Sequence, residues 1–130
     1  DVHLATYEAA LDMLLAKTDP KLVTYELDTY HVLQGGAQPL FYLKKYPDRF
    51  ELLHLKDMVK GTPIGQQTIG NPVGETSVVL GTGMLDWPAI FAASTKAGVK
   101  IYYIDDESAA AQTQVPESVQ YLKSHNKWKP

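Results

Sequence analysis

Three side chains able to bind a divalent metal ion lie at or just after the ends of separate apolar segments. Asp28 directly follows the segment 22–27, His54 lies near the end of 50–55, and Asp105 directly follows 99–104. If these segments are parallel strands, their carboxyl ends share one edge, where α/β folds place their ligands. Carboxylate oxygen and imidazole nitrogen suit one divalent ion such as Mn²⁺, Zn²⁺, Co²⁺ or Mg²⁺. The spacing therefore predicts a metal site at this edge.

Each of the three residues also has a purely structural interpretation. Asp28 can end its strand by accepting hydrogen bonds from loop amides. A histidine within an apolar run, such as His54, is commonly a hydrogen-bonded core residue, and Asp105 opens an acidic run that solvated loops also contain. The shared position of the three at strand ends favours the metal site over three separate structural roles.

Two further residues lie close to the predicted site in sequence. His31 follows Asp28 by three residues and either points to the same edge or is an exposed loop histidine. Lys56 follows His54 by two residues, where its ammonium either holds a substrate oxygen or pairs with Asp57.

The apolar patterning predicts alternating helices and strands. Helical spacing, proline at helix starts and Gly98 after a helix end predict helices at 5–17, 39–46, 87–97 and 116–124. The first of these has an apolar side formed by Tyr7, Leu11, Leu14 and Leu15. Apolar and β-branched runs predict strands at 22–27, 50–55, 76–80 and 99–104. This order indicates parallel βα units.

The segment 57–75 interrupts this alternation. It contains four glycines and two prolines and is longer than a usual connection, so it is expected to be a functional loop or disordered. The polar segment 125–130 is expected to fray.

The 130 residues are enough for one domain of about four parallel βα units with a preceding helix. An eight-unit barrel takes about 250 residues, and an open parallel sheet leaves unpaired edges. The prediction is therefore a partial barrel over 1–130 that self-associates or lacks an N-terminal portion. Asp1 in place of an initiating methionine agrees with a processed protein or a piece of a longer one.

Composition excludes several classes of protein. The chain has no cysteine, which removes disulfides, thiolate metal sites and a cysteine nucleophile. A net charge of −3 without basic clusters argues against a nucleic-acid surface. No apolar run approaches the roughly 20 residues of a membrane span.

Gly81-Thr82-Gly83 is similar to a phosphate-binding turn but lacks the full glycine pattern.

Several motifs together resemble those of one known family. They are Glu-Leu-Asp-Thr-Tyr-His at 26–31, Leu-His-Leu-Lys-Asp-Met at 53–58, Gly-Thr-Gly-Met-Leu-Asp-Trp at 81–87 and Tyr-Tyr-Ile-Asp-Asp-Glu-Ser at 102–108. In this order they are similar to the sugar phosphate isomerase/epimerase family, the xylose-isomerase-like TIM barrels. The resemblance implies that the chain provides the last four βα units of an (β/α)8 barrel.

The resemblance also implies roles for the candidate residues. Family members hold one divalent ion with four side chains at the barrel mouth. Asp28 and His54 match two of these, and Asp105 falls where the family usually has glutamate. The fourth ligand comes from an earlier strand without a counterpart here. His31 and Lys56 would be substrate-side groups.

The implied chemistry is proton abstraction beside the carbonyl of a sugar or sugar phosphate, through an enediolate. Asp105 would supply one of the two proton-moving carboxylates. The intact protein is expected to be a ketose isomerase or epimerase, or a keto-polyol dehydratase, and the isolated chain is expected to be inactive. The alternative is a non-catalytic sugar- or metal-binding relative. A barrel endonuclease would need more histidines and a basic face. Localisation stays open, with the cytoplasm favoured by analogy to relatives.

Overall fold

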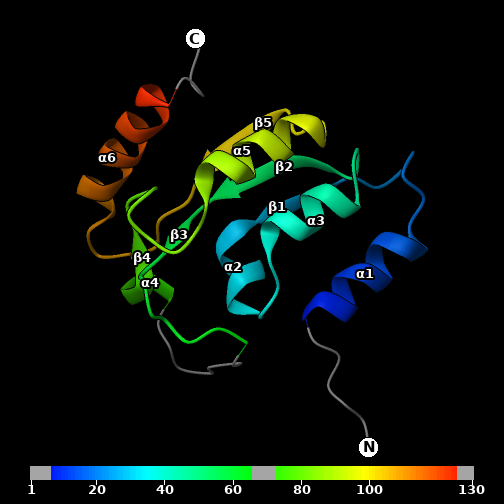
Figure 1. Ribbon diagram of the computed structural model, residues 1–130, viewed down its shortest axis with the longest axis horizontal. Coiled ribbons are helices and arrows are strands. Elements are labelled where there is room, and N and C mark those ends of the chain that lie inside the picture. The colour runs from blue at the N-terminus through cyan, green and yellow to red at the C-terminus, as the bar shows by residue number, and fades with distance from the viewer. Residues whose placement is uncertain (1–6, 66–72, 126–130) are drawn as a thin grey trace, which may run out of the picture.

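The computed structural model describes residues 7–65 and 73–125 and has a parallel sheet at its centre (Figure 1). Three strands form this sheet in the order β1-β2-β5: β1 (Tyr25–Asp28), β2 (Phe50–Leu55) and β5 (Ile101–Ile104). Both strand pairs are parallel. The prediction of an α/β fold with parallel βα units is confirmed.

Six helices surround the strands in the described residues: α1 (Tyr7–Lys17), α2 (Thr29–Gln34), α3 (Pro39–Lys45), α4 (Val73–Thr76), α5 (Trp87–Lys96) and α6 (Ala111–Ser124). Proline stands in the first turn of both α3 and α5, where its fixed φ suits the helix and its missing N–H is not needed. The Asp86 side chain caps α5 by accepting a 3.1 Å hydrogen bond from the Ala89 amide.

The prediction of a parallel strand at 76–80 is wrong in extent and in pairing. Only Ser77–Val78 is extended (β4), and it pairs antiparallel with β3 (Asp57–Met58). The chain leaving β2 continues into β3 and takes this segment away from the main sheet. As a result β5 pairs directly with β2, and the described sheet has three parallel strands instead of four. The predicted long loop at 57–75 likewise contains β3 and most of α4, although residues 66–72 lie outside the described part.

Several other details of the elements differ from expectation. The first strand begins at Tyr25, and Leu22 is 83% exposed. Leu14 is also exposed, so the buried side of α1 among its described side chains is Leu11 and Leu15. α2 was not predicted, and α6 begins at Ala111 with Pro116 inside it. The tail from residue 126 lies outside the described residues.

The two faces of the main sheet differ in burial. One face carries Leu27, Leu53 and Leu55, which pack in one core cluster with side chains of α1, α3 and α5. Residues in register across the strands share a face, so Asp28, His54 and Tyr103 lie together on the opposite face.

The opposite face is the more exposed one. Glu26, Ile101 and Tyr103 on it are exposed, and Leu52 and His54 are half-buried. Parallel sheets are usually covered on both faces. This face corresponds to the interior that a closed barrel encloses.

Candidate metal centre

Asp28 ends β1 and also begins α2. Its Oδ1 accepts hydrogen bonds from the amides of Tyr30 and His31, each at 2.9 Å, and so caps the helix. Its Oδ2 faces Nδ1 of His54 at 3.4 Å. Oδ1 of Asp28 therefore accepts hydrogen bonds from backbone amides, as the structural interpretation expects. Oδ2 takes no part in this cap and is directed at β2.

His54 lies between two carboxylates of β1. Its Nε2 is 2.9 Å from Oε1 of Glu26, and its Nδ1 faces Asp28. The ring of Tyr103 on β5 contacts the imidazole edge to face, with centroids 5.8 Å apart. The ring is thus restrained by both neighbouring strands and is not part of the hydrophobic core.

Asp105 reaches the same edge from the residue after β5. Its Oδ2 accepts a 2.9 Å hydrogen bond from Nζ of Lys56, which also donates to Glu107 at 2.6 Å. The Lys56 side chain is only 1% exposed. Burial alone would lower the pKa of Lys56, but the bonds to Glu107 and Asp105 outweigh it, and the pKa lies above its ordinary value. Lys56 therefore stays a cation that holds Asp105 in place.

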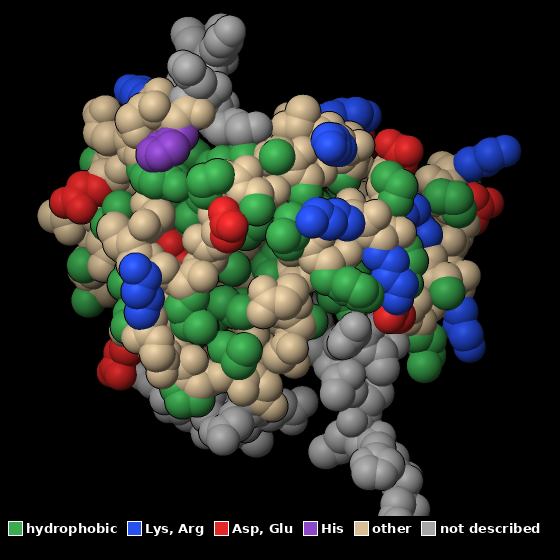
Figure 2. Space-filling view, in the orientation of Figure 1, with side chains coloured by type: hydrophobic (Ala, Val, Ile, Leu, Met, Phe, Trp, Pro, Cys, Tyr) green, Lys and Arg blue, Asp and Glu red, His purple; other side chains and the backbone are tan. Residues whose placement is uncertain are grey.

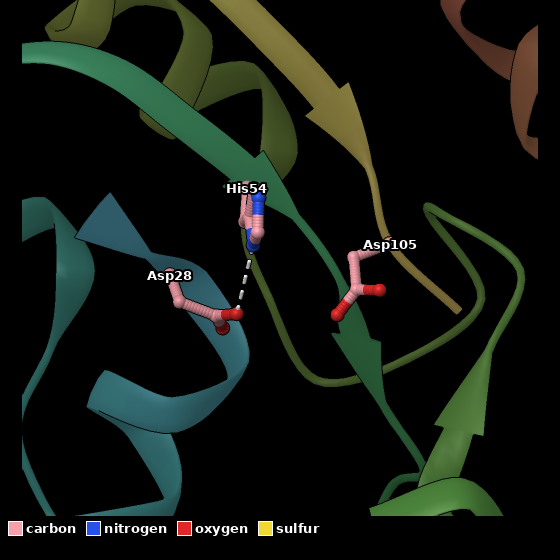
Figure 3. Close-up of side chains that lie close together, drawn as sticks. All are labelled: Asp28, His54 and Asp105. Atoms are coloured by element: carbon pink, nitrogen blue, oxygen red, sulfur yellow. Dashed lines mark ion pairs between the residues drawn. The ribbon is translucent and has the colours of Figure 1, made fainter. Parts of the chain in front are cut away.

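The three predicted ligands meet in space. One ligand atom from each of Asp28, His54 and Asp105 lies within 4.8 Å of the other two, and each side chain is half-buried. Figure 3 shows Asp28 at the end of β1, His54 near the end of β2 and Asp105 just after β5, with their side chains projecting into a common space. Two carboxylates and one imidazole form a donor set that fits Mn²⁺, Zn²⁺, Co²⁺ or Mg²⁺, and a tetrahedral or octahedral ion would keep further positions for substrate or water.

Thr29 fixes the edge on which these residues stand. Its buried hydroxyl lies 3.0 Å and 2.9 Å from the carbonyl oxygens of His54 and Lys56 and accepts a bond from the Lys56 amide at 3.1 Å. These contacts join the first residue of α2 to the end of β2. The relative position of Asp28 and His54 is therefore set by the Thr29 hydroxyl as well as by strand pairing.

His31 is near the site but is not one of the three grouped residues. It lies in α2, and its Nδ1 is 3.3 Å from Oε1 of Gln34. Its ring packs edge to face on Tyr30. The interpretation as a freely exposed loop histidine is wrong, because the residue is helical and half-buried.

Asp57 next to Lys56 has a structural role. Its fully buried carboxylate accepts hydrogen bonds from the amides of Met58, Gly81, Gly83 and Leu85 and from the indole of Trp87. The amides of Gly81 and Gly83 are therefore used inside the protein, which removes the phosphate-binding interpretation of this turn. Trp87 is a fully buried packing residue.

A hollow of about 540 Å³ lies elsewhere, between α3 and α5. It belongs to the helix-covered side of the sheet and is lined by Leu43, Lys44, Pro47, Ala89, Ala92, Ala93, Lys96 and Ala97. This lining contains no carboxylate and no histidine. In the view of Figure 2, most Lys and Arg side chains lie in the right half, with Asp and Glu among them.

Sequence reasoning missed three residues that support the site. Glu26 is signalled by its position two residues before Asp28, which places both on one face of a strand. Glu107 belongs to the acidic run that begins at Asp105, but the sequence gives no signal of its contact with Lys56. Thr29 carries no signal in sequence, because its contacts depend on the pairing of β1 with β2.

Comparison with solved structures identifies the fold. A sugar phosphate isomerase/epimerase from Parabacteroides distasonis ATCC 8503 superposes with a TM-score of 0.70 at 27% identity, covering 93% of this chain and 38% of that chain. The chain has the fold of the sugar phosphate isomerase/epimerase family. A second structure of this description from the same organism gives a TM-score of 0.70 at 29% identity. The IOLI protein, solved with a bound zinc atom, shares the fold at a TM-score of 0.65 and 22% identity.

Sequence comparison with curated proteins finds inosose dehydratases. One from Bacillus cereus (strain AH820) is 44% identical over 50 residues, and one from Geobacillus kaustophilus (strain HTA426) is 46% identical over 48 residues. These matches cover 38% and 37% of this chain but only 17% and 16% of the relatives' lengths. No protein-family profile matches the chain. The chain is thus similar to inosose dehydratases over a small part of their length.

None of the helices in the described residues is long and apolar enough to span a membrane.

Proposed function

We propose that the protein is a divalent-metal-dependent isomerase or epimerase of a ketose or ketose phosphate, of which this chain supplies the C-terminal barrel units. The observation that supports this most strongly is the convergence of Asp28, His54 and Asp105 at the strand ends of a sugar phosphate isomerase/epimerase fold. The zinc atom of the IOLI protein supports the metal dependence, because that protein shares the fold.

The proposed metal ligands are Asp28 through Oδ2, His54 through its ring nitrogen and Asp105 through a carboxylate oxygen. A divalent ion bound there would act as a Lewis acid toward the oxygens of a carbonyl and the adjacent hydroxyl. Aspartate is one methylene shorter than the family's usual glutamate at Asp105, so its reach toward substrate is reduced. Lys56 holds the Asp105 carboxylate in place through a 2.9 Å hydrogen bond.

Asp105 is also the proposed proton-transfer group. Its Oδ2 is bound to Lys56, which leaves Oδ1 to take a proton from the carbon beside the carbonyl. The bond from Lys56 fixes the orientation of this carboxylate. His31 and Lys56 remain the proposed substrate-side groups, with one donor of the Lys56 ammonium not used by the two carboxylates.

A keto-polyol dehydratase is the second candidate function. It is favoured by the 44% identity to an inosose dehydratase over 50 residues. Both reactions begin with proton removal beside a carbonyl. They differ in the next step, because the dehydratase expels a hydroxyl group whereas the epimerase returns a proton.

Solvent exchange separates the two candidates. The chain with Mn²⁺ is incubated in D2O with ketoses and with a keto-inositol, and products are followed by NMR. Deuterium at the carbon beside the carbonyl with retained hydroxyls supports the isomerase or epimerase, and loss of water supports the dehydratase. For the isolated chain we expect neither, because the second proton-moving carboxylate is proposed to come from an earlier strand. The same assay with a protein that includes that strand should give turnover, and no turnover there would support a binding protein.

The exposed sheet face bears on assembly. Ile101 and Tyr103 remain 46% and 45% exposed on a face that parallel sheets usually cover. We propose that this face is covered either by further strands of a longer protein or by self-association of the chain. A light-scattering mass of the isolated chain distinguishes a monomer from a dimer.

A further inference from the structure

Glu26 has a contact that the proposed metal site does not by itself explain. It lies two residues before Asp28 on β1, so both carboxylates are on the same face of the sheet. In the strand register Asp28 stands opposite His54, and Glu26 stands opposite Leu52. The imidazole is therefore flanked by two acidic residues of one strand, with Nε2 at 2.9 Å from Glu26 and Nδ1 at 3.4 Å from Asp28.

The two distances divide the roles of the ring nitrogens. A neutral imidazole has one N–H donor and one lone pair. The 2.9 Å contact to Glu26 is the shorter of the two and lies within the distance range of an N–H···O bond, so we assign the N–H to Nε2 and the lone pair to Nδ1. Nδ1 and Oδ2 of Asp28 then face each other with lone pairs on both atoms, an arrangement that a shared cation stabilises.

We infer that Glu26 is a positioning residue that fixes the tautomer and orientation of His54, so that Nδ1 binds a divalent cation together with Asp28 and Asp105. This inference rests on the proposed metal site and adds to it a carboxylate that acts through the histidine. Metal-binding histidines commonly donate their second N–H to such a carboxylate, and losing it weakens metal binding about 10- to 100-fold. Tyr103, packed edge to face on the ring, restrains the same orientation from β5.

The test combines calorimetry with NMR of the metal-free and Zn²⁺-loaded chain. Zn²⁺ affinity is measured for the wild type, Glu26→Ala and Glu26→Gln, and ¹H–¹⁵N correlations of the His54 ring report which nitrogen carries the proton. Glu51→Ala is the matched control, because it removes the same charge from the adjacent strand β2, where Glu51 pairs with Lys100.

We expect Zn²⁺ binding about 10- to 100-fold weaker in Glu26→Ala, close to wild type in Glu26→Gln, whose amide oxygen still accepts the N–H, and unchanged in Glu51→Ala. In the wild type, the Zn²⁺-loaded ring should carry its proton on Nε2. Wild-type affinity in Glu26→Ala, or Zn²⁺ on Nε2, would overturn the role of Glu26 and leave the metal site standing. Absence of Zn²⁺ binding by the folded wild type would instead overturn the metal site and the inference with it.

Discussion

Two acidic regions lie near the end of β2: the buried Asp57 with its hydrogen-bond donors, which we call the Asp57 cluster, and the group of Asp28, His54 and Asp105. They differ in how their carboxylate oxygens are used. Asp57 is fully buried, and its carboxylate accepts hydrogen bonds from four backbone amides and one indole. In the group of Asp28, His54 and Asp105, each side chain is half-buried and keeps a ligand atom directed at its neighbours. A saturated carboxylate stabilises a turn, whereas carboxylates that share a space with unused lone pairs are suited to bind a cation.

The difference is instructive because Asp57 and His54 belong to the same sequence motif, only three residues apart. Alternation along the chain sends His54 to the exposed face of the sheet and Asp57 into the contact between β3 and the turn at 81–87. The Gly-Thr-Gly-Met-Leu-Asp-Trp motif is thus explained by one buried acceptor. Gly83 leaves room for the carboxylate, since a Cβ there would overlap Asp57 and the carbonyl oxygen of Met58, whereas a Cβ at Gly81 would overlap the ring of Tyr121.

The largest expected effect on stability is that of Asp57→Ala. The change leaves several buried donors without an acceptor, and we expect a loss of about 3–5 kcal/mol in the free energy of unfolding. Urea unfolding followed by circular dichroism measures it. A loss below about 1 kcal/mol would mean that water or the backbone replaces the carboxylate and that the contrast between the clusters is wrong.

Gly83→Ala tests the same cluster without removing a charge. The added methyl group must displace the Asp57 carboxylate or the Met58 carbonyl, and we expect a loss of about 1–3 kcal/mol. The measurement is again the urea midpoint, with Gly61→Ala as a comparison. No atom lies within 4 Å of a Cβ at Gly61, although its φ of +86° adds its own backbone strain.

Asp28→Ala should separate stability from metal affinity. The loss of the α2 cap predicts a decrease of about 1 kcal/mol in the free energy of unfolding. Metal affinity should fall strongly, because a ligand is removed. Asp28→Asn, which keeps a capping oxygen, should restore most of the stability and little of the Mn²⁺ affinity. Equal recovery of both properties would assign Asp28 a capping role alone.

The smallest effect concerns pH and the surroundings of Asp57. Burial raises the pKa of Tyr121 above its ordinary value of 10.0, and the carboxylates of Asp57 and Asp86 raise it further. The phenol therefore stabilises the fold fully below pH 10.0, and this contribution is lost as the pH rises through the folded-state pKa. Between pH 8 and pH 11, Tyr121→Phe should lose less of its urea midpoint than the wild type. If the urea midpoints of the two proteins change with pH in parallel, Tyr121 is not coupled to the carboxylates of Asp57 and Asp86.

Much of the fold could be predicted from the sequence, because apolar spacing and capping residues act locally. Asp86, Pro88 and Gly98 mark α5 within one residue of its observed ends. α2 is not evident from the sequence because Thr29, Tyr30 and Val32 have modest helix propensity, and in the structure Asp28 caps this helix. The expected start of α6 is too late, because proline favours the first turn of a helix, whereas Pro116 lies inside α6.

What the sequence could not show depends on contacts between distant segments. The convergence of Asp28, His54 and Asp105 was predictable, because it needs only parallel strands that end at the same edge. The antiparallel pairing of β3 with β4 was not, because both strands have two residues and no periodicity of their own. The enclosure of Lys56 by Asp105 and Glu107 likewise follows from tertiary packing and not from spacing.

A calorimetric titration with Mn²⁺ of the wild-type chain and of His54→Ala tests the central claim most directly. The proposed site predicts saturable binding of one ion per wild-type chain and loss of that binding in His54→Ala, with both proteins folded by circular dichroism. Binding that is unchanged in His54→Ala, or a folded wild-type chain that binds no Mn²⁺, would contradict the assignment of Asp28, His54 and Asp105 as a metal site.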